Sequence, residues 1–308
     1  MLTPEIRALN EAFVEHLNTP GMEKVAVSAA EEFTRTHIKD DGFYRKIITM
    51  QPIKADQLTR QVHDDRWIKV IDKQPGSPGA MSVGFGTLPT QLYLKGPRYA
   101  VGFHRILTPK MYKDLAELAT WEMDIRQVVS DDMVNDILGE EDGKFLQAVN
   151  TAIGPVRDIE SPISGAVQWQ SFWGGVSRDT LQEAKTIIAK GPSRLMPEKV
   201  LCNMIFISQL MKIPFDEWGG PGSEDVFKNG WTTKRFMDMD WIISIERRLV
   251  PDNTLYMFGD ENFIGKSFVW EEPTMWVDRE MFLVYWASYE TIGGGFGNTS
   301  PMARADFL

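Results

Sequence analysis

Residues 60–106 constrain the fold most, because they predict two long strands separated by a turn-rich segment. Residues 67–71, 91–94 and 99–103 have the β-branched and aromatic composition of strands. Between the first two, residues 74–79 read Gln-Pro-Gly-Ser-Pro-Gly, which is typical of a turn. A hairpin of this length is barely stable by itself in water. We therefore expect this excursion to need a partner surface, which indicates assembly.

Apolar residues at helical spacing predict several amphipathic helices. Thr108 and Pro109 predict an N-cap and a first-turn proline for the longest helical region, and the Ser-Asp-Asp sequence at 130–132 predicts the cap of a second helix within it. Thr180 and Glu183 have the spacing of a capping box. The predicted helices cover residues 4–17, 23–38, 109–153, 178–190 and 204–212. Further strands are predicted at residues 199–203, 241–245, 254–258 and 281–286, so the fold class is α+β.

The charge of the chain excludes a surface that reads nucleic acid. The formal net charge is −10, and the longest basic run is the pair Arg247-Arg248. Binding many phosphates needs clustered Lys and Arg. An acidic wall that only encloses DNA remains compatible with this charge. No apolar stretch of about 18 residues predicts a membrane span, and the N-terminus lacks an apolar signal core, so we expect a protein made in the cytoplasm.

Motifs that carry catalysis are absent from the sequence. There is no GxxxxGK[ST] loop, HExxH helix or GxSxG elbow. The four histidines are His16, His37, His63 and His104. The triplet His63-Asp64-Asp65 has donor atoms for a cation, but a solvated turn beside a strand explains it better. We therefore predict no catalytic residue, no cofactor-binding residue, no metal ligand and no cofactor.

Three other features receive structural explanations. Cys202 is the single cysteine and lies in an apolar run, so we interpret it as a small buried hydrophobe. The glycine-rich segment 293–297 is interpreted as a flexible or tight turn. We interpret a set of carboxylates as residues on solvated helix and loop faces: Glu140, Glu141, Asp142, Asp238, Asp240, Glu271 and Glu272.

Several segments, in order, resemble one known family. Residues 99–109 (Tyr-Ala-Val-Gly-Phe-His-Arg-Ile-Leu-Thr-Pro), followed by Lys113-Asp114, Glu117-Leu118, Asp124-Ile125-Arg126 and Asp131-Asp132, resemble the start of the long spine helix in major capsid proteins of tailed bacteriophages of the Hong Kong 97 type. Residues 250–258 and 263–266 are similar to the late strands of that family, and 290–298 with 303–307 to its ending. The order of these matches, rather than any strict signature, carries the resemblance.

The resemblance implies an α+β, Hong Kong 97-like capsid fold with four parts. These are an N-terminal arm at 1–40, an extended E-loop hairpin at 55–98, a P-domain with the spine helix at 41–54, 99–155 and 275–308, and an A-domain at 156–274. It implies a major head protein that self-assembles as pentamers and hexamers into an icosahedral shell around double-stranded DNA. The protein is then found in the virion, and in the host cytoplasm during assembly.

The same resemblance implies partners and one possible covalent bond. Because the chain starts at Met1 with a short helical arm, we expect a separate scaffolding protein, together with a portal and, optionally, a decoration protein. Some family members cross-link a loop Lys to an Asn of the next subunit. Lys69, Lys73, Lys95 and Asn298 occupy comparable places, although ordinary solvated side chains explain them better.

Two alternatives remain open at this point. An encapsulin, which forms a cellular compartment around cargo enzymes, has the same fold, and a neighbouring cargo gene rather than terminase and portal genes would indicate it. A soluble α+β enzyme would be a compact monomer or small oligomer with a deep polar pocket. The shell subunit would instead be flat, with a protruding hairpin and arm.

Overall fold

A computed structural model describes most of the chain after residue 41. The described residues are 42–61, 64–73, 96–114, 116–117, 125–154, 168–191, 195–213, 235–244 and 248–308, with Ala12, Glu15, Ser82, Gly84, Phe85, Gln91 and Tyr93 as single positions. Ala12 and Glu15 are helical. The rest of the predicted helix 4–17, the predicted helix 23–38 and the turn 74–79 lie outside the described residues.

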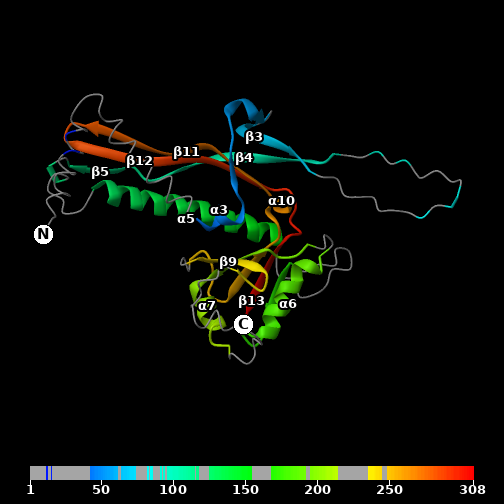
Figure 1. The fold of residues 1–308 in the computed structure, drawn as a ribbon. Helices are drawn as coiled ribbons and strands as arrows, with labels where there is room; N and C mark the ends of the chain where they lie inside the picture. Colours follow the sequence, from blue (N-terminus) through cyan, green and yellow to red (C-terminus); the bar gives the residue numbers. More distant parts are fainter. Residues whose placement is uncertain are drawn as a thin grey trace.

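A seven-stranded sheet forms the upper layer of the molecule in Figure 1. Its strand order is β1-β11-β12-β4-β3-β2, and β5 also pairs with β12. The strands are β1 (Met50–Pro52), β2 (Thr59–Gln61), β3 (Asp64–Asp72), β4 (Arg98–Leu107), β5 (Met111–Asp114), β11 (Gly265–Glu280) and β12 (Leu283–Phe296). β11 and β12 form one long antiparallel hairpin, from Gly265 opposite Phe296 to Glu280 opposite Leu283. This hairpin is the backbone of the layer.

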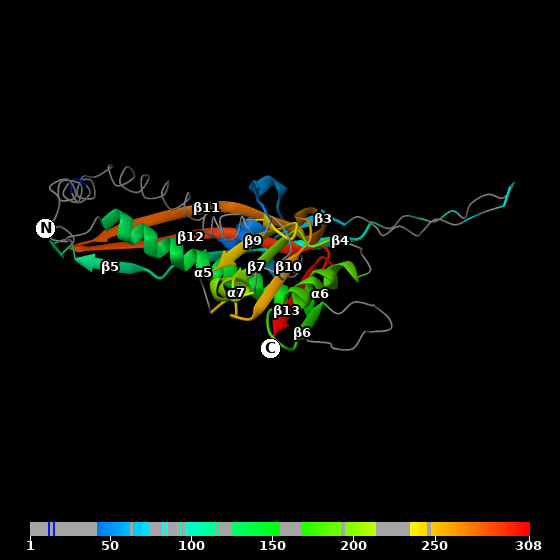
Figure 2. The same ribbon diagram turned by 60° about the horizontal axis from the view of Figure 1, so that its bottom comes forward.

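The base of the predicted excursion is the antiparallel pair β3–β4. Ile68 lies opposite Gly102 and Asp72 opposite Arg98, whose side chains form an ion pair at 2.8 Å. The strands predicted at 67–71 and 99–103 are therefore confirmed. The pair points away from the body at the end opposite β5 (Figures 1 and 2).

Two helices pack on one face of this sheet, α3 (Phe43–Ile47) and the long α5 (Ile125–Ile153) (Figure 1). The prediction that a helix starts at Thr108 is wrong, because residues 111–114 form β5. The Thr108 hydroxyl accepts a hydrogen bond from the Ser288 N–H at 2.8 Å, and the Thr108 N–H donates to the Ser288 carbonyl at 2.9 Å. This cross-strand pairing replaces an N-cap.

The Ser-Asp-Asp sequence at 130–132 does not cap a second helix either, because α5 runs through it without interruption. The 29 residues of α5 form one helix, which ends where predicted, before Gly154 with φ of +79°. A left-handed glycine at this position is a common way to stop a helix.

A six-stranded sheet with order β6-β13-β10-β7-β9-β8 forms the lower part of the molecule. Its elements are β6 (Trp169–Phe172), α6 (Arg178–Ala189), β7 (Lys199–Asn203), α7 (Met204–Leu210), β8 (Arg235–Phe236), β9 (Met239–Ser244), β10 (Thr254–Phe258) and β13 (Met302–Phe307); the short helices η1 (Ala55–Gln57) and α10 (Glu261–Ile264) complete the described elements. These bounds confirm the elements predicted from residue 178 to residue 258. The capping box of α6 uses Ser177 and Thr180, one turn before the predicted pair.

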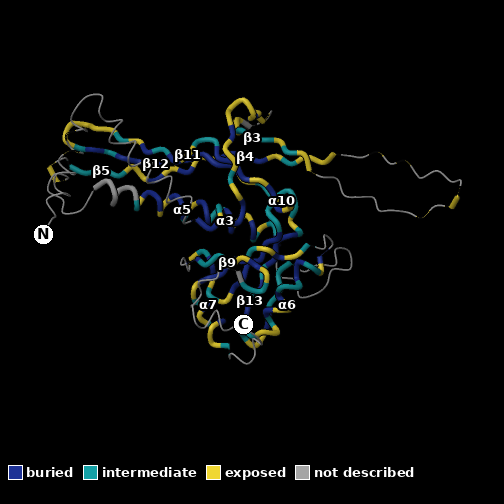
Figure 3. The backbone as a smooth tube through the Cα atoms, in the orientation of Figure 1, coloured by how far each residue is buried: buried dark blue, intermediate teal, exposed yellow. Residues whose placement is uncertain are grey.

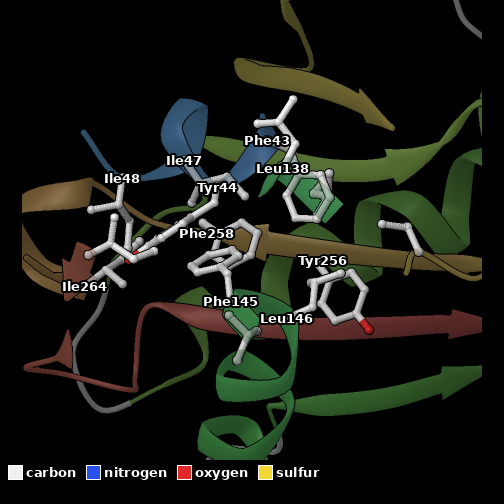
Figure 4. Packing of buried hydrophobic residues seen from close by; sticks show 14 of the residues in the cluster. Phe43, Tyr44, Ile47, Ile48, Leu138, Phe145, Leu146, Tyr256, Phe258 and Ile264 are labelled. Atoms are coloured by element: carbon white, nitrogen blue, oxygen red, sulfur yellow. The ribbon is translucent and has the colours of Figure 1, made fainter. Parts of the chain in front are cut away.

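One hydrophobic cluster joins the two sheets. Phe145 of α5 lies between Tyr44 of α3, at 4.5 Å between ring centroids, and Phe258 of β10, at 5.8 Å (Figure 4). A second cluster fills the space between the six-stranded sheet, α6 and α7. The buried positions in Figure 3 therefore continue from the long helix into the lower sheet.

Two segments lie in a different sheet from the one that the predicted domain limits imply. Residues 302–307, assigned to the P-domain, pair with β10 and β6, and Phe307 packs in the second cluster. Residues 265–274, assigned to the A-domain, pair with β12 as part of the continuous hairpin. A limit at residue 275 cannot divide this hairpin, because the ladder continues on both sides of it.

Candidate assembly surface

The glycine-rich segment 293–297 lies largely in β12, so the prediction of a turn is wrong. A Cβ on Gly294 would collide with the Tyr44 hydroxyl. A Cβ on Gly295 would lie 2.8 Å from Val101 Cγ2, and one on Gly293 would lie 3.0 Å from the Phe103 ring. These glycines leave room for the Tyr44 side chain of α3 and for the Val101 and Phe103 side chains of the neighbouring strand β4.

The sheet face away from α5, here called the outer face, carries exposed aromatic side chains. Because side chains alternate along a strand, Tyr285 and Tyr289 point away from the buried Glu290 and Ile292, which face α5. Tyr112 lies opposite Tyr285. The exposed side chains on this face include Leu107 and Tyr112, both 65% exposed, and Trp276, 41% exposed.

Cations hold these rings in place. Lys110 Nζ lies 4.1 Å from the Tyr285 ring centroid and 5.0 Å from that of Trp276. The Arg105 guanidinium lies 5.1 Å from the Tyr289 ring centroid, and its Nη2 donates to Glu271 Oε2 at 2.7 Å. Cation–π contacts of this kind are attractive. The outer face is therefore a preorganised aromatic surface, and aromatic rings with few mobile torsions are favoured at protein interfaces.

The free end of the β11–β12 hairpin, here called the hairpin tip, is also apolar. Met281 is 82% exposed and Phe282 is 73% exposed. Met281 has φ of 55°, which is uncommon for a bulky residue. Large contiguous apolar exposure marks interaction sites more often than chance. The outer face and the hairpin tip are therefore the candidate assembly surface.

A buried ionic junction lies under the other face of the sheet. Arg45 of α3 binds Glu141 of α5 with two hydrogen bonds, at 3.1 and 3.0 Å, and its Nη2 also donates to Glu290 of β12. The side chains of Glu141 and Glu290 are both fully buried. Asp142 accepts hydrogen bonds from the N–H groups of Phe43 and Tyr44 and so caps α3.

The prediction that Glu141 and Asp142 lie on a solvated face is therefore wrong. The sequence contained a signal that could have corrected it. Residues 137, 141, 145 and 149 follow one another at steps of four, so they share one face of the helix. Ile137, Phe145 and Val149 on that face are all buried apolar residues. The partner Arg45 had no comparable signal.

Electrostatics in the junction are set by burial. Burial, followed by the charge of Glu141, raises the pKa of Glu290 to about 8. Burial raises the pKa of Tyr44 to about 12, although its hydroxyl shares a hydrogen bond with Ser267 Oγ at 2.7 Å. Burial lowers the pKa of Arg45, but the charges of Glu141 and Glu290 outweigh it and leave that pKa above its usual value. The arrangement joins three elements and offers no nucleophile.

The remaining predicted residues are spread over the molecule. Cys202 is fully buried, and burial raises the pKa of its thiol, so the interpretation as a buried hydrophobe is confirmed. Asp238, Asp240 and Glu272 are exposed, as predicted. His104 lies on β4, where burial lowers its pKa. Of the histidines and lysines named in the sequence analysis, His16, His37, His63 and Lys95 lie outside the described part of the chain.

Within the described ranges, no group of His, Cys, Asp and Glu is arranged to hold a metal ion. None of the helices described is both long and apolar enough to cross a membrane. An open hollow of about 460 Å³ lies beside the start of α6, where Lys212 is the charged lining side chain. Lys69 Nζ donates to the Gln57 carbonyl at 3.4 Å.

No protein-family model and no curated protein matches this chain. Solved structures do match. A structure from Microbacterium phage Oxtober96 has a TM-score of 0.59 and 12% identity, over 87% of this chain and 92% of that one. The capsid of the native GTA particle has a TM-score of 0.58 and 13% identity, over 86% and 89%.

A virus-like particle from Pyrococcus furiosus matches with a TM-score of 0.55 and 11% identity, over 91% of this chain and 99% of that one. At identities this low, the structural similarity establishes a shared fold and nothing further. The agreement covers nearly the full length of these chains and includes the mixed helices and sheets described above. The chain therefore has the α+β, Hong Kong 97-like capsid fold that its sequence resemblance predicted.

Proposed function

We propose that this chain is the major capsid protein of a tailed bacteriophage and builds the icosahedral shell around double-stranded DNA. The observation that carries the proposal is the fold match to the GTA capsid and to the phage Oxtober96 structure, which covers 86% and 87% of this chain at TM-scores of 0.58 and 0.59. The exposed aromatic outer face supports it, because an isolated subunit gains nothing from leaving such a surface in water.

In the proposed shell, each part of the chain has a distinct role. The arm at 1–40 and the E-loop at 55–98 contact neighbouring subunits. The strands of the seven-stranded sheet outside the E-loop form the P-domain together with α5, and the six-stranded sheet with α6 and α7 forms the A-domain, which lies around the five-fold and six-fold axes. Identical subunits that close a shell bury surface on several neighbours at once. Many modest contacts then give a large collective stability.

The proposal extends to partners and place. Pentamers and hexamers of the chain assemble with a separate scaffolding protein, a portal and, optionally, a decoration protein. A net charge of −10 fits a wall that encloses DNA without reading its sequence. The protein would occupy the virion, and the host cytoplasm during assembly.

An encapsulin-like compartment is the second candidate. The observation that favours it is the match to the virus-like particle from Pyrococcus furiosus, which covers 99% of that chain. A phage shell would contain DNA and depend on a scaffold, whereas a compartment would assemble unaided around protein cargo. The contents and diameter of purified particles separate the two.

The test is assembly of the full chain, expressed alone and together with the scaffold candidate encoded beside it. Size-exclusion chromatography and negative-stain electron microscopy should show pentamers, hexamers, tubes or closed shells. A compact monomer in both preparations would refute the shell and reopen the enzyme alternative, for which the hollow beside Lys212 would be the first place to examine.

A further inference from the structure

Each end of the short helix α3 is capped by a side chain from a different part of the fold. At the N-terminal end, Asp142 of α5 accepts hydrogen bonds from the first two N–H groups of the helix, at 3.2 and 2.9 Å. At the C-terminal end, Lys199 of β7 donates to the carbonyls of Lys46 and Ile47, at 3.0 and 2.9 Å. The first N–H groups and the last carbonyls of a helix have no partner inside it, so these two side chains satisfy groups that the helix cannot.

The charges of the two caps also match the dipole of the helix. The Asp142 carboxylate lies at the N-terminus and the Lys199 ammonium at the C-terminus, which is the arrangement that the partial charges of a helix favour. α3 has five residues, and a helix this short is not stable without tertiary contacts. Formation of α3 therefore depends on both caps being held in place, one helix length apart.

The two caps belong to different layers of the molecule. α5 packs on the seven-stranded sheet, whereas β7 is an interior strand of the six-stranded sheet (Figure 1). Lys199 Nζ also binds Glu261 of α10 at 3.1 Å, and Glu261 accepts a hydrogen bond from the Thr49 hydroxyl just beyond α3. α3 therefore lies across the joint between the two sheets and is bonded on both sides of it.

The apolar cluster at this joint does not supply such directional contacts. Phe43, Tyr44 and Ile47 of α3 are buried together with Tyr256 and Phe258 of β10 (Figure 4). The hydrophobic effect is not directional, so it opposes separation of the sheets more than rotation of one sheet on the other. Hydrogen bonds depend on both distance and angle. The bonds at the two ends of α3 are therefore the contacts that resist rotation.

We propose that α3 is a clamp between the two sheets: Asp142 and Lys199 hold its two ends, and the helix between them sets the position of one sheet relative to the other. Loss of either cap unwinds α3 and lets the sheets rotate on their shared apolar cluster. In the proposed shell both sheets contact neighbours, so a fixed position lets identical subunits repeat the same contacts. The clamp is a property of the single subunit, so failure of shell assembly would leave it standing.

Distances within one subunit, measured by double electron–electron resonance, test the clamp. Spin labels are attached to the full chain through Glu280→Cys at the end of β11 and Ser208→Cys on α7, two exposed positions in the two layers. Cys202 is fully buried, so it should stay unlabelled. An excess of unlabelled chain restricts the signal to distances within a subunit, whether or not copies assemble. The wild type should give one narrow distance distribution.

Two substitutions remove one cap each. Lys199→Met keeps most of the length of the side chain without its ammonium group, and Asp142→Asn keeps the shape but replaces one acceptor by a donor. Both variants should broaden the distance distribution, although the two residues lie in different layers. Both should also reduce the protection of residues 42–50 in hydrogen–deuterium exchange, by about two- to thirtyfold, which is the range expected for a lost helix cap.

Lys185→Met is the matched control. Lys185 Nζ donates to the Met237 carbonyl at 2.7 Å within the six-stranded sheet and its helix α6, so the same kind of bond is lost away from α3. The control should keep the narrow distribution. If Asp142→Asn does not fold, Tyr44→Phe takes its place, because it removes the hydrogen bond that joins α3 to Ser267 of the upper sheet.

Three results would overturn the clamp. Unchanged widths in both variants would show that the apolar cluster alone fixes the two sheets. Equal broadening in the control would show a general loosening of the fold. Broadening in one variant alone would assign the effect to that side chain's other contacts, since a clamp has to be held at both ends.

Discussion

Phe145→Ala should remove much of the stability of the subunit, because this one ring connects both sheets. Phe145 is 4% exposed and contacts Tyr44, Phe258 and Phe296, at 4.5, 5.8 and 6.0 Å between ring centroids. Replacing a buried Phe by Ala costs about 3–5 kcal/mol. Total stabilities are about 5–15 kcal/mol. We therefore expect a loss of about 4–5 kcal/mol, in the upper half of that range, because aromatic pairs on three sides are lost.

Urea unfolding of the soluble subunit, followed by tryptophan fluorescence at one fixed pH, measures this loss. Phe282→Ala is the matched control, because the same side chain at the hairpin tip is 73% exposed. The control should change the free energy of unfolding by less than about 0.5 kcal/mol. If the alanine variant does not fold, Phe145→Leu should give a smaller loss in the same direction. Equal values for Phe145→Ala and Phe282→Ala would refute the common core.

Three further predictions address the sheet. Gly294→Ala should cost about 1–3 kcal/mol by thermal or urea unfolding, because its Cβ collides with the Tyr44 hydroxyl, whereas Gly139→Ala in α5, with open space around it, should gain up to about 1 kcal/mol. Trp276→Ser, on the outer face, should leave the free energy of unfolding within about 1 kcal/mol but reduce the yield of assembled particles in electron micrographs; unchanged yields would exclude the outer face from assembly. Glu290→Gln should flatten the dependence of stability on pH. The raised pKa of Glu290 gives the wild type stability that is complete below pH 4.5 and lost by about pH 8. The free energy of unfolding of the variant should therefore exceed that of the wild type at pH 8 by at most about 5 kcal/mol, and a value below that of the wild type would contradict the raised pKa.

Local pattern predicted the lower sheet well. Residues 254–258 form a fully buried strand, and α6 has a strong apolar face with Leu181, Ala184, Ile187 and Ile188 buried. In both cases the run of apolar residues and its length were sufficient to choose strand or helix. These elements lie in the interior of one domain, where local preference and tertiary packing agree.

The failures share a physical cause, which is a contact between residues distant in sequence. Thr108 has the local pattern of an N-cap, but Ser288 supplies backbone groups that pair with it as in a strand. Gly293 and its neighbours have the composition of a turn, but their lack of side chains serves the approach of Tyr44 and Phe103. Glu141 has the composition of a surface residue, yet Arg45 satisfies it in the interior.

The excursion and the core belong to one continuous sheet, and this has a mechanical consequence. Val101 and Phe103 of β4 are buried with Phe268 of β11, while Arg98 and Ala100 of the same strand are exposed. Trp67 of β3 packs edge-on against Trp270 at 5.6 Å between ring centroids, so the base of the excursion is fixed on both of its strands. Because Phe103 lies opposite Gly293 in β12, a load applied to the excursion by a neighbouring subunit reaches the strand that also carries Glu290. A neighbour that tilts β4 would therefore act on the interface of β12 with α3 and α5.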